Sequence, residues 1–263
     1  MNIHKHIHYI ISFSAGLLLM SCLNENEPES FFPTLATVNM EGNQVELESD
    51  SYGRLAVENP EVLKAGDADS TGQRVLVGVQ FLEENQPSES QASEESLTPV
   101  KIIEFLSKVL TKRADDLRVG GTSDIYGDAP IQITAASISE HHLNIQYEIG
   151  NATPYGRHRI SLVLTPDTQV DPEGLIQVEF RHNAEGDWGN ERLWGIAAYT
   201  LESIPEYDME GVKGFKILYN SGANRMAEWT VQKTEVTPYT YKRYMLRPWI
   251  SNNLHEKDGT DTP

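Results

Sequence analysis

Cysteine is almost absent from this chain, because Cys22 is the only one among 263 residues. A disulfide needs two cysteines, so an intrachain disulfide framework is excluded, and so is a metal site built from several cysteines. A lone thiol is a liability in an exported protein. Its position directly after an apolar segment indicates that Cys22 is consumed by a covalent modification.

Basic residues are scarce relative to acidic ones: 21 Lys and Arg stand against 39 Asp and Glu, for a formal net charge of −18. Such a surface repels phosphate backbones, so we expect no nucleic-acid partner. Beyond the N-terminus, no apolar run is long enough to span a bilayer.

Motifs of common catalytic sites are also missing. The sequence has no glycine-rich phosphate loop, no zinc-protease helix motif and no GxSxG elbow. Ser/His/Asp combinations can be drawn with His141, His142, His158 or His182, but the sequence alone favours none of them. We therefore expect a non-enzyme with no metal and no cofactor other than covalent lipid.

Residues 1–21 are expected to be a signal peptide. The run from Tyr9 to Met20 has the length of a signal-peptide core, and it ends in Leu19-Met20-Ser21-Cys22, which resembles the lipobox of bacterial lipoproteins. By that resemblance, Cys22 carries a diacylglycerol and, after cleavage, an N-acyl chain. The alternative is an uncleaved signal anchor that buries Cys22, but the polar, acidic residues 24–29 could not continue such a helix in lipid.

Residues 22–33 are expected to form a flexible acidic tether. The acidic run after Cys22 also resembles a surface-export signal of lipoproteins in some Gram-negative anaerobes. The expected location is therefore the cell envelope, with the chain lipid-anchored to the outer membrane. Exposure on the cell surface and exposure to the periplasm both remain open.

Residues 34–119 are expected to form a small OB-like β-barrel. Val45 and Leu47 alternate with polar residues as in a half-buried strand, and Val75, Val77 and Val79 repeat the pattern. Residues 83–98 form an acidic insertion with the composition of a disordered loop. For the next segment, residues 100–110, strand and helix are both open, and the apolar spacing favours helix.

Residues 128–236 are expected to form an immunoglobulin-like antiparallel β-sandwich, which makes the fold class all-β. Seven strand candidates recur at the spacing of such a fold: 131–135, 143–149, 160–164, 176–180, 193–201, 215–219 and 229–231. The segment 193–201 is apolar on both faces and is expected to be a central strand. Residues 237–263 form a C-terminal tail.

Three segments resemble the NigD-like lipoprotein family. Residues 178–187, followed by Leu193-Trp194-Gly195, look like the signature hairpin of that family. Residues 128–133 resemble the start of its C-terminal domain, and residues 72–77 a strand of its N-terminal domain. The resemblance spans residues 20–233 and implies an OB-like domain followed by a β-sandwich on a lipoprotein. The family takes its name from a bacteriocin gene cluster and implies no molecular activity.

The best candidate binding site is the predicted hairpin from Arg181 to Trp194. If Val178 and Phe180 point inward, Glu179 and Arg181 face outward, beside Asn183 and Trp188. An aromatic ring with planar polar groups is typical of a sugar-binding site. The other interpretation is structural: Glu179 and Arg181 pair across strands, Asn183 serves the turn, and Trp188 covers the end of the core.

Two further patterns are weaker. Glu185, Asp187 and Glu191 lack the alternate-ligand spacing of a calcium loop. His141-His142 is expected at a hairpin bend, exposed and inert.

Two functions follow from these features. The first is a non-catalytic envelope lipoprotein that binds a protein partner, with a link to bacteriocin handling or self-protection. The alternative is a glycan-binding envelope lipoprotein that uses the Arg181–Trp194 hairpin.

Overall fold

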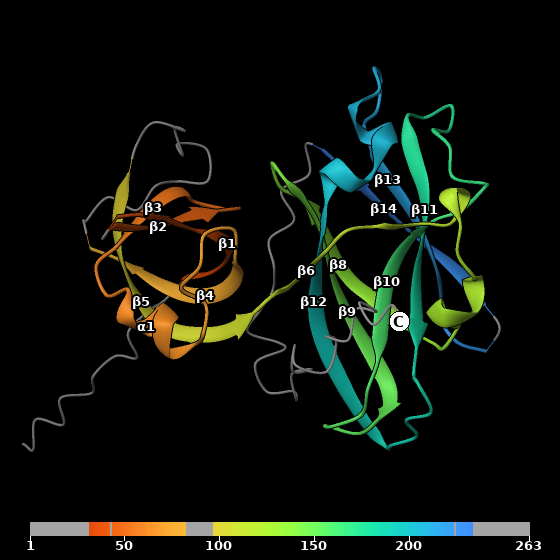
Figure 1. Cartoon of the computed structure of the whole chain (residues 1–263), viewed down its shortest axis with the longest axis horizontal. Coiled ribbons are helices and arrows are strands. Elements are labelled where there is room, and N and C mark those ends of the chain that lie inside the picture. Colours follow the sequence, from red (N-terminus) through yellow and green to blue (C-terminus); the bar gives the residue numbers. More distant parts are fainter. Residues whose placement is uncertain (1–31, 43, 83–96, 224, 234–263) are drawn as a thin grey trace, which may run out of the picture. The chain divides into compact units, whose positions relative to one another are not determined.

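The computed structural model describes residues 32–42, 44–82, 97–223 and 225–233. The predicted signal peptide (1–21) and tail (237–263) lie outside the described residues, together with Cys22, nearly all of the tether and residues 83–96 of the acidic insertion. Within the described ranges, no helix is long and apolar enough to cross a membrane. The all-β expectation is confirmed (Figure 1).

The N-terminal module is a closed five-stranded barrel with the strand order β1-β2-β3-β5-β4. Strands β3 and β5 are parallel and the other neighbours antiparallel. A five-stranded Greek-key barrel with a helix between its third and fourth strands has the OB-like arrangement, as predicted. The elements are β1 (Phe32–Glu41), β2 (Gln44–Ser49), β3 (Gly53–Val57), α1 (Glu61–Ala65), β4 (Arg74–Phe81) and β5 (Thr98–Lys108).

The preference for a helix over residues 100–110 is wrong, because β5 is a strand across most of this segment. It pairs with β4 on one side and β3 on the other, and so closes the barrel. Two register shifts interrupt its pairing with β4. An irregular ladder changes which face successive residues occupy. The apolar residues therefore do not alternate cleanly along the sequence.

The C-terminal module is a sandwich of two sheets, and all seven predicted strands are present. One sheet has the order β14-β13-β11-β10-β7 and the other β6-β12-β9-β8. The strands are β6 (Leu110–Lys112), β7 (Asp115–Asp116), β8 (Gln132–Ile138), β9 (His142–Ala152), β10 (Arg159–Leu164), β11 (Leu175–Asn183), β12 (Glu191–Thr200), β13 (Gly214–Asn220) and β14 (Met226–Gln232). Short 3₁₀ helices are η1 (Leu117–Val119), η2 (Ser123–Tyr126), η3 (Leu201–Ser203) and η4 (Pro205–Asp208).

The sheets differ from the purely antiparallel pattern that we expected. The pairs β11–β13, β10–β7 and β12–β6 are parallel. Strands β11 and β12 belong to different sheets. The predicted hairpin between Arg181 and Trp194 is therefore a crossover from one sheet to the other.

The domain boundaries also shift at two places. Residues 110–116, which the sequence patterns placed in the barrel domain, provide an edge strand to each sheet of the sandwich. Phe32 and Pro33, placed in the tether, begin β1 and pair with Val79 and Gly78. The predicted boundary, between residues 119 and 128, comes after β6 and β7, so the sequence gave no signal of these short edge strands.

Strand β12 is buried on both faces, as predicted. On one face Leu193, Ala197 and Tyr199 join the sandwich core. The other face belongs to a separate cluster that combines residues of the two modules, namely Leu35, Leu76, Val109, Trp194, Ile196 and Ala198. The continuous apolar run of β12 therefore serves two hydrophobic cores.

A buried polar network accompanies this apolar contact. Arg74, on β4, binds both carboxylate oxygens of Asp50 at 2.8 and 2.6 Å, and its Nη2 also donates to Asn144 Oδ1 on β9 at 2.9 Å. Asn144 Nδ2 in turn donates to Asp50 Oδ2 at 3.0 Å. The ion pair is buried, with 1% of the Arg74 side chain and 11% of Asp50 exposed. Barrel and sandwich are thus joined by a buried, charged and hydrogen-bonded contact.

Candidate functional site

The structure confirms which way the predicted site residues on β11 face. Val178 and Phe180 are in the core, and Glu179 and Arg181 lie on the outer face of the sheet. Arg181 Nε donates to Glu179 Oε2 at 2.6 Å. The two side chains therefore pair with one another along a single strand, whereas the structural interpretation had paired them across strands.

Asn183 and Trp188 lie beyond the end of this pair. Asn183 Nδ2 donates to the carbonyl of Ile125 at 2.9 Å, and its Oδ1 accepts from the backbone N–H of Glu185 at 2.9 Å. Asn183 thus holds the turn after β11. Trp188 is 84% exposed in the β11–β12 connection, so it does not cover the core.

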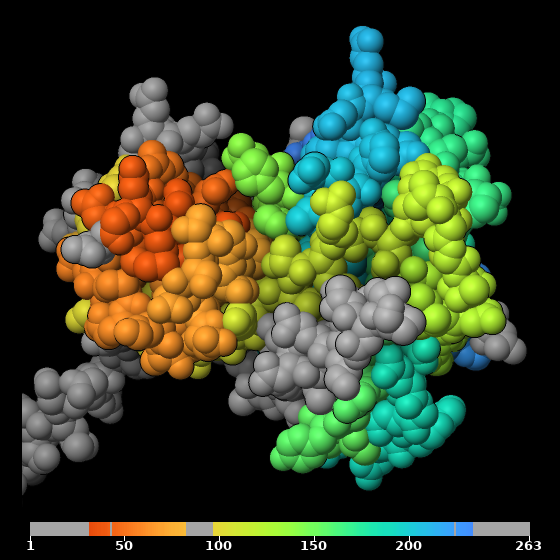
Figure 2. Space-filling view, viewed as in Figure 1, coloured from red at the N-terminus to blue at the C-terminus, as the bar shows by residue number. Residues whose placement is uncertain are grey.

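A second exposed aromatic residue lies on the neighbouring loop. Tyr155, between β9 and β10, is 88% exposed. We call residues 153–157 and 184–190 together the aromatic loop end. Figure 2 shows the two loops as adjacent green and blue-green surface at the lower edge of the view.

The aromatic loop end is tied together by close backbone contacts. The Gly189 N–H donates to the Asn151 carbonyl at 2.8 Å. A Cβ at Gly189 would lie 1.9 Å from the Ala152 carbonyl oxygen, and one at Gly156 would lie 1.9 Å from Asp187 Oδ2. At Gly189 the clash is with backbone, so any side chain would push the two loops apart, whereas at Gly156 a side chain would displace the Asp187 carboxylate.

Asp187 links the two loops to the core of the sandwich. Its carboxylate accepts from the backbone N–H of Thr153 at 2.7 Å and from the Thr153 hydroxyl at 3.0 Å. His158 Nε2 contacts Asp187 Oδ2 at 3.0 Å. Although burial acts to raise it, the bonds from Thr153 and His158 hold the pKa of Asp187 below its usual value. Asp187 is therefore ionised at neutral pH.

Two buried imidazoles continue this chain of contacts. His158 Nδ1 lies 3.0 Å from His182 Nε2, and His182 Nδ1 lies 2.9 Å from the carbonyl oxygen of Pro130. Burial lowers the pKa of His182 to about 4. Burial also lowers the pKa of His158, although its hydrogen bond to Asp187 acts in the opposite direction. We call His158, His182 and Asp187 the histidine array.

The histidine array contains an aspartate–imidazole pair of the kind found in hydrolase triads. In a triad, the other ring nitrogen of the histidine faces a hydroxyl nucleophile. Here the Nδ1 of His158 faces His182. This geometry can hold and share protons, and among the described residues the ring nitrogens of both histidines face partners other than a hydroxyl.

The sequence carried a signal for the array that we did not use. His182 follows Val178 and Phe180 at the same alternation, and His158 precedes Ile160 and Leu162 in the same way. Both imidazoles were therefore due to face the core, where a polar ring needs a hydrogen-bond partner. The partner Asp187 sits in a loop, and no periodicity points to it.

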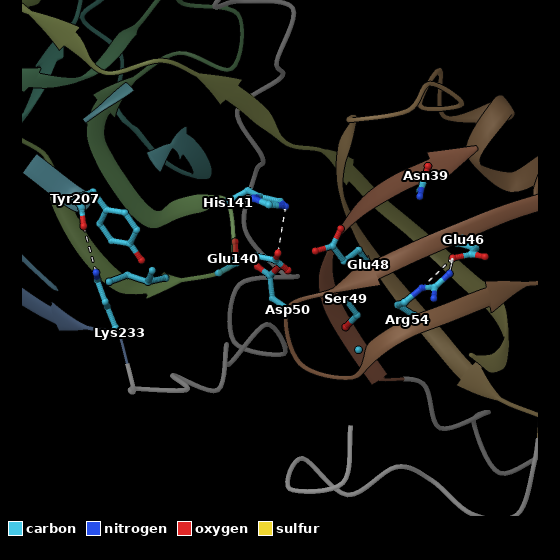
Figure 3. A pocket seen from close by; sticks show the side chains of 13 residues that line it. Asn39, Glu46, Glu48, Ser49, Asp50, Arg54, Glu140, His141, Tyr207 and Lys233 are labelled. Carbon is cyan, nitrogen blue, oxygen red and sulfur yellow. Dashed lines mark hydrogen bonds and ion pairs between the residues drawn. The ribbon is translucent and has the colours of Figure 1, made fainter. Parts of the chain in front are cut away.

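A cavity of about 680 Å³ lies elsewhere, lined by β2, the β8–β9 turn and η4 (Figure 3). On one side are Glu48 and the Arg54–Glu46 ion pair; on the other, Lys233 stands 3.9 Å from the centre of the Tyr207 ring. Its lining residues are Asn39, Glu46, Glu48, Ser49, Asp50, Gly53, Arg54, Ile138, Ser139, Glu140, His141, Tyr207 and Lys233.

Glu48, Glu140 and His141 converge in this cavity, with one ligand atom from each lying within 4.8 Å of the others. Burial raises the pKa of Glu48, and the neighbouring Glu140 carboxylate raises it further. Two carboxylates and an imidazole are donors that first-row divalent metals accept. Glu140 and His141 are exposed, so a metal ion held by these three residues would also be in contact with solvent.

Comparison with known proteins identifies the C-terminal module. Residues 115–233 match the model of the NigD-like C-terminal beta sandwich domain. This range begins at β7 and ends just after β14, so it coincides with nearly all of the sandwich. Among curated proteins, no match to the chain is found.

Several solved structures share the two-module fold. A candidate toxin-related protein from Parabacteroides distasonis is 25% identical, with a TM-score of 0.55 and coverage of 78% of this chain and 95% of its own. A candidate lipoprotein from Bacteroides fragilis is 12% identical (TM-score 0.57; 79% and 100% covered). A NigD-like immunity protein from Bacteroides caccae is 17% identical (TM-score 0.51; 76% and 92% covered). The predicted resemblance is confirmed: residues 115–233 match the NigD-like C-terminal beta sandwich domain, and the solved structures share the fold of this chain.

Proposed function

We propose that this chain is a lipid-anchored, non-catalytic protein of the outer membrane that binds a protein partner through its aromatic loop end. The observation that carries the binding function is the exposure of Tyr155 and Trp188 on two loops fastened to each other. Large aromatic side chains are common anchors of protein interfaces, because they bury much apolar area and lose little conformational entropy.

The state of the loops supports this proposal. Thr153 on one loop and His158 directly before β10 are each hydrogen-bonded to Asp187 on the other loop. Loops that are already ordered pay less entropy when they bind. A surface braced in this way, with its aromatic residues left in solvent, has the properties of a preorganised binding site.

The anchor is supported by the sequence and by one relative. Leu19-Met20-Ser21-Cys22 follows an apolar run of signal-peptide length, and the fold is shared with a candidate lipoprotein. Two or more acyl chains hold a protein on a membrane far better than one, at about 0.8 kcal/mol per buried methylene. The proposed binding of a protein partner is supported by the fold that this chain shares with a NigD-like immunity protein. A toxin-type protein is therefore the first partner to test.

The anchor is tested by labelling producing cells with radioactive palmitate. We expect label in the natural chain and none in Cys22→Ala, with intact mass confirming removal of residues 1–21. An unlabelled natural chain with a free thiol would contradict the anchor. Protease treatment of intact cells then distinguishes the cell surface from the periplasm.

The binding surface is tested by site-specific photo-crosslinking in the producing envelope. A photoreactive residue at position 188 is expected to give one reproducible protein adduct, and the same residue at exposed Met209, directly after η4, is the matched control. The adduct should disappear when Tyr155→Ala is added. Equal crosslinking from positions 188 and 209 would contradict a specific partner surface.

Glycan binding is the second candidate, and the exposed ring of Trp188 favours it. A sugar stacked on this ring would change its fluorescence, and Trp188→Ala would abolish the binding. Glu179 and Arg181 are already paired with each other, so they contribute less to this candidate than the sequence suggested. A glycan array on which the natural chain and Trp188→Ala bind alike would remove it.

A further inference from the structure

The histidine array contains three short contacts, and each of them needs one proton. They are His182 Nδ1 to the Pro130 carbonyl, His182 Nε2 to His158 Nδ1, and His158 Nε2 to Asp187 Oδ2, at 2.9, 3.0 and 3.0 Å. A carbonyl oxygen and an ionised carboxylate can only accept. The outer nitrogen of each ring must therefore carry a hydrogen to form its bond.

Two neutral imidazoles supply only two protons. If both outer nitrogens are protonated, His182 Nε2 and His158 Nδ1 face each other as two lone pairs. If one ring instead donates to the other, its own outer nitrogen loses its hydrogen, and that outer contact fails. With neutral rings, one of the three contacts always lacks a hydrogen.

We propose that the histidine array is a proton-dependent clasp that binds a third proton and closes all three contacts only in that state. The extra proton makes one ring an imidazolium, whose charge is balanced by Asp187. The closed array is then neutral overall, and hydrogen bonds to charged groups are stronger than those between neutral groups. Because Asp187 also holds Thr153, the proton reinforces the tie between the two loops of the aromatic loop end.

The surroundings set the pH range of this uptake. Among the described residues, the charged groups that bear on the two rings are Asp187 and Glu185, and Arg159 lies 3.6 Å from Glu185. Burial opposes the charge, so uptake falls below pH 6.5, where a free imidazole titrates. The effect on the clasp is local. Both rings of the unfolded chain titrate near pH 6.5, so acid still lowers the free energy of unfolding while it closes the clasp.

The test is nitrogen-15 NMR of the histidine rings in the full chain, held in detergent micelles and titrated from pH 8 to pH 4. Signals are assigned with His158→Asn and His182→Asn. At pH 8, we expect two protonated nitrogens among the four of His158 and His182. Below pH 6.5, we expect three, with both rings responding in one step.

Asp187→Asn removes the balancing charge and is expected to lower the pH of uptake by about one to three units. The matched control is Glu185→Gln, which removes a nearby charge that no hydrogen bond joins to either ring; its shift should be smaller. Two results would overturn the clasp. One is a single proton on each ring throughout the folded range. The other is independent uptake by the two rings at the same pH in the natural chain and in Asp187→Asn.

Discussion

Two buried polar networks in the described part of the chain join neighbouring parts with different chemistry. Between barrel and sandwich, Arg74 and Asp50 form a buried ion pair, and Asn144 is hydrogen-bonded to both of them. Beneath the aromatic loop end, two imidazoles and Asp187 make a chain that lacks one hydrogen when the rings are neutral.

The two networks differ in whether their hydrogen bonds depend on pH. A guanidinium stays protonated and offers five donors in a fixed geometry, so the contact it makes does not depend on pH. An imidazole changes its charge near neutrality. The Arg74 contact between the modules is therefore permanent, and the histidine part of the contact between the two loops of the aromatic loop end is conditional.

The largest expected effect is the loss of the permanent contact. Arg74→Ala leaves Asp50 and Asn144 in a buried site without their cation, and removal of one partner of a buried pair costs about 3–5 kcal/mol. Urea unfolding should show this loss in the free energy of unfolding. Arg54→Ala is the control, because the Arg54–Glu46 pair is exposed and ion pairs in solvent contribute little to stability. Equal effects of the two variants would contradict the distinction.

The second effect concerns the conditional contact. Gly156→Ala would place a Cβ 1.9 Å from Asp187 Oδ2, so the carboxylate must leave His158 and Thr153. We expect a loss of about 1–3 kcal/mol in the free energy of unfolding, as for other overpacked sites. Gly150→Ala is the matched control, because nothing lies within 4 Å of a Cβ there. If both variants unfold alike, the loops are not held as tightly as the geometry indicates.

The fold could be predicted from the sequence where one face of a strand is buried. Six sandwich strands followed from alternation and β12 from its continuous apolar run, but β5 did not follow, because register shifts in its pairing with β4 disturb the pattern. The contact between modules was visible only as an excess of apolar residues. Leu76 and Ile196 point away from the barrel core and the sandwich core, respectively. Apolar residues on such outer faces indicate that another part of the protein covers them. That they cover each other depends on tertiary contacts.

The candidate site was predictable to a smaller extent. Trp188 was chosen for its residue type and is exposed. Glu179 and Arg181 face outward as alternation requires, but the sequence could not show that they satisfy each other. Tyr155 and Asp187 were missed as site residues because loop residues have no periodicity, and their roles arise from two loops that meet in space.

The third expected effect concerns His142, a titratable neighbour of the Arg74 network. His142, expected to be exposed, is buried, and burial lowers its pKa to about 4, with the charge of Arg74 adding to the effect. The unfolded chain binds this proton near pH 6.5. The contribution of His142 to stability is therefore complete above pH 6.5 and is lost as the pH falls toward 4.

This contribution can be isolated with two variants. Unfolding by urea at pH 7.5, 6 and 5 should show a shallower fall of stability in His142→Asn than in the natural chain. His141→Asn, its exposed neighbour, should retain the full fall. His158 and His182 contribute to the fall in all three proteins, so only the difference is informative. Parallel curves for His142→Asn and the natural chain would show that His142 is not buried as a neutral ring.

The smallest effect on stability is expected at the surface that the conditional contact supports. Trp188→Ala and Tyr155→Ala each remove a ring that solvent already surrounds, so the free energy of unfolding should change by no more than about 0.5 kcal/mol. Partner crosslinking at the aromatic loop end should nevertheless be lost. Separation of these two readouts is the signature of a binding residue. A loss of stability above about 1 kcal/mol in either variant would instead show that its ring packs against the protein.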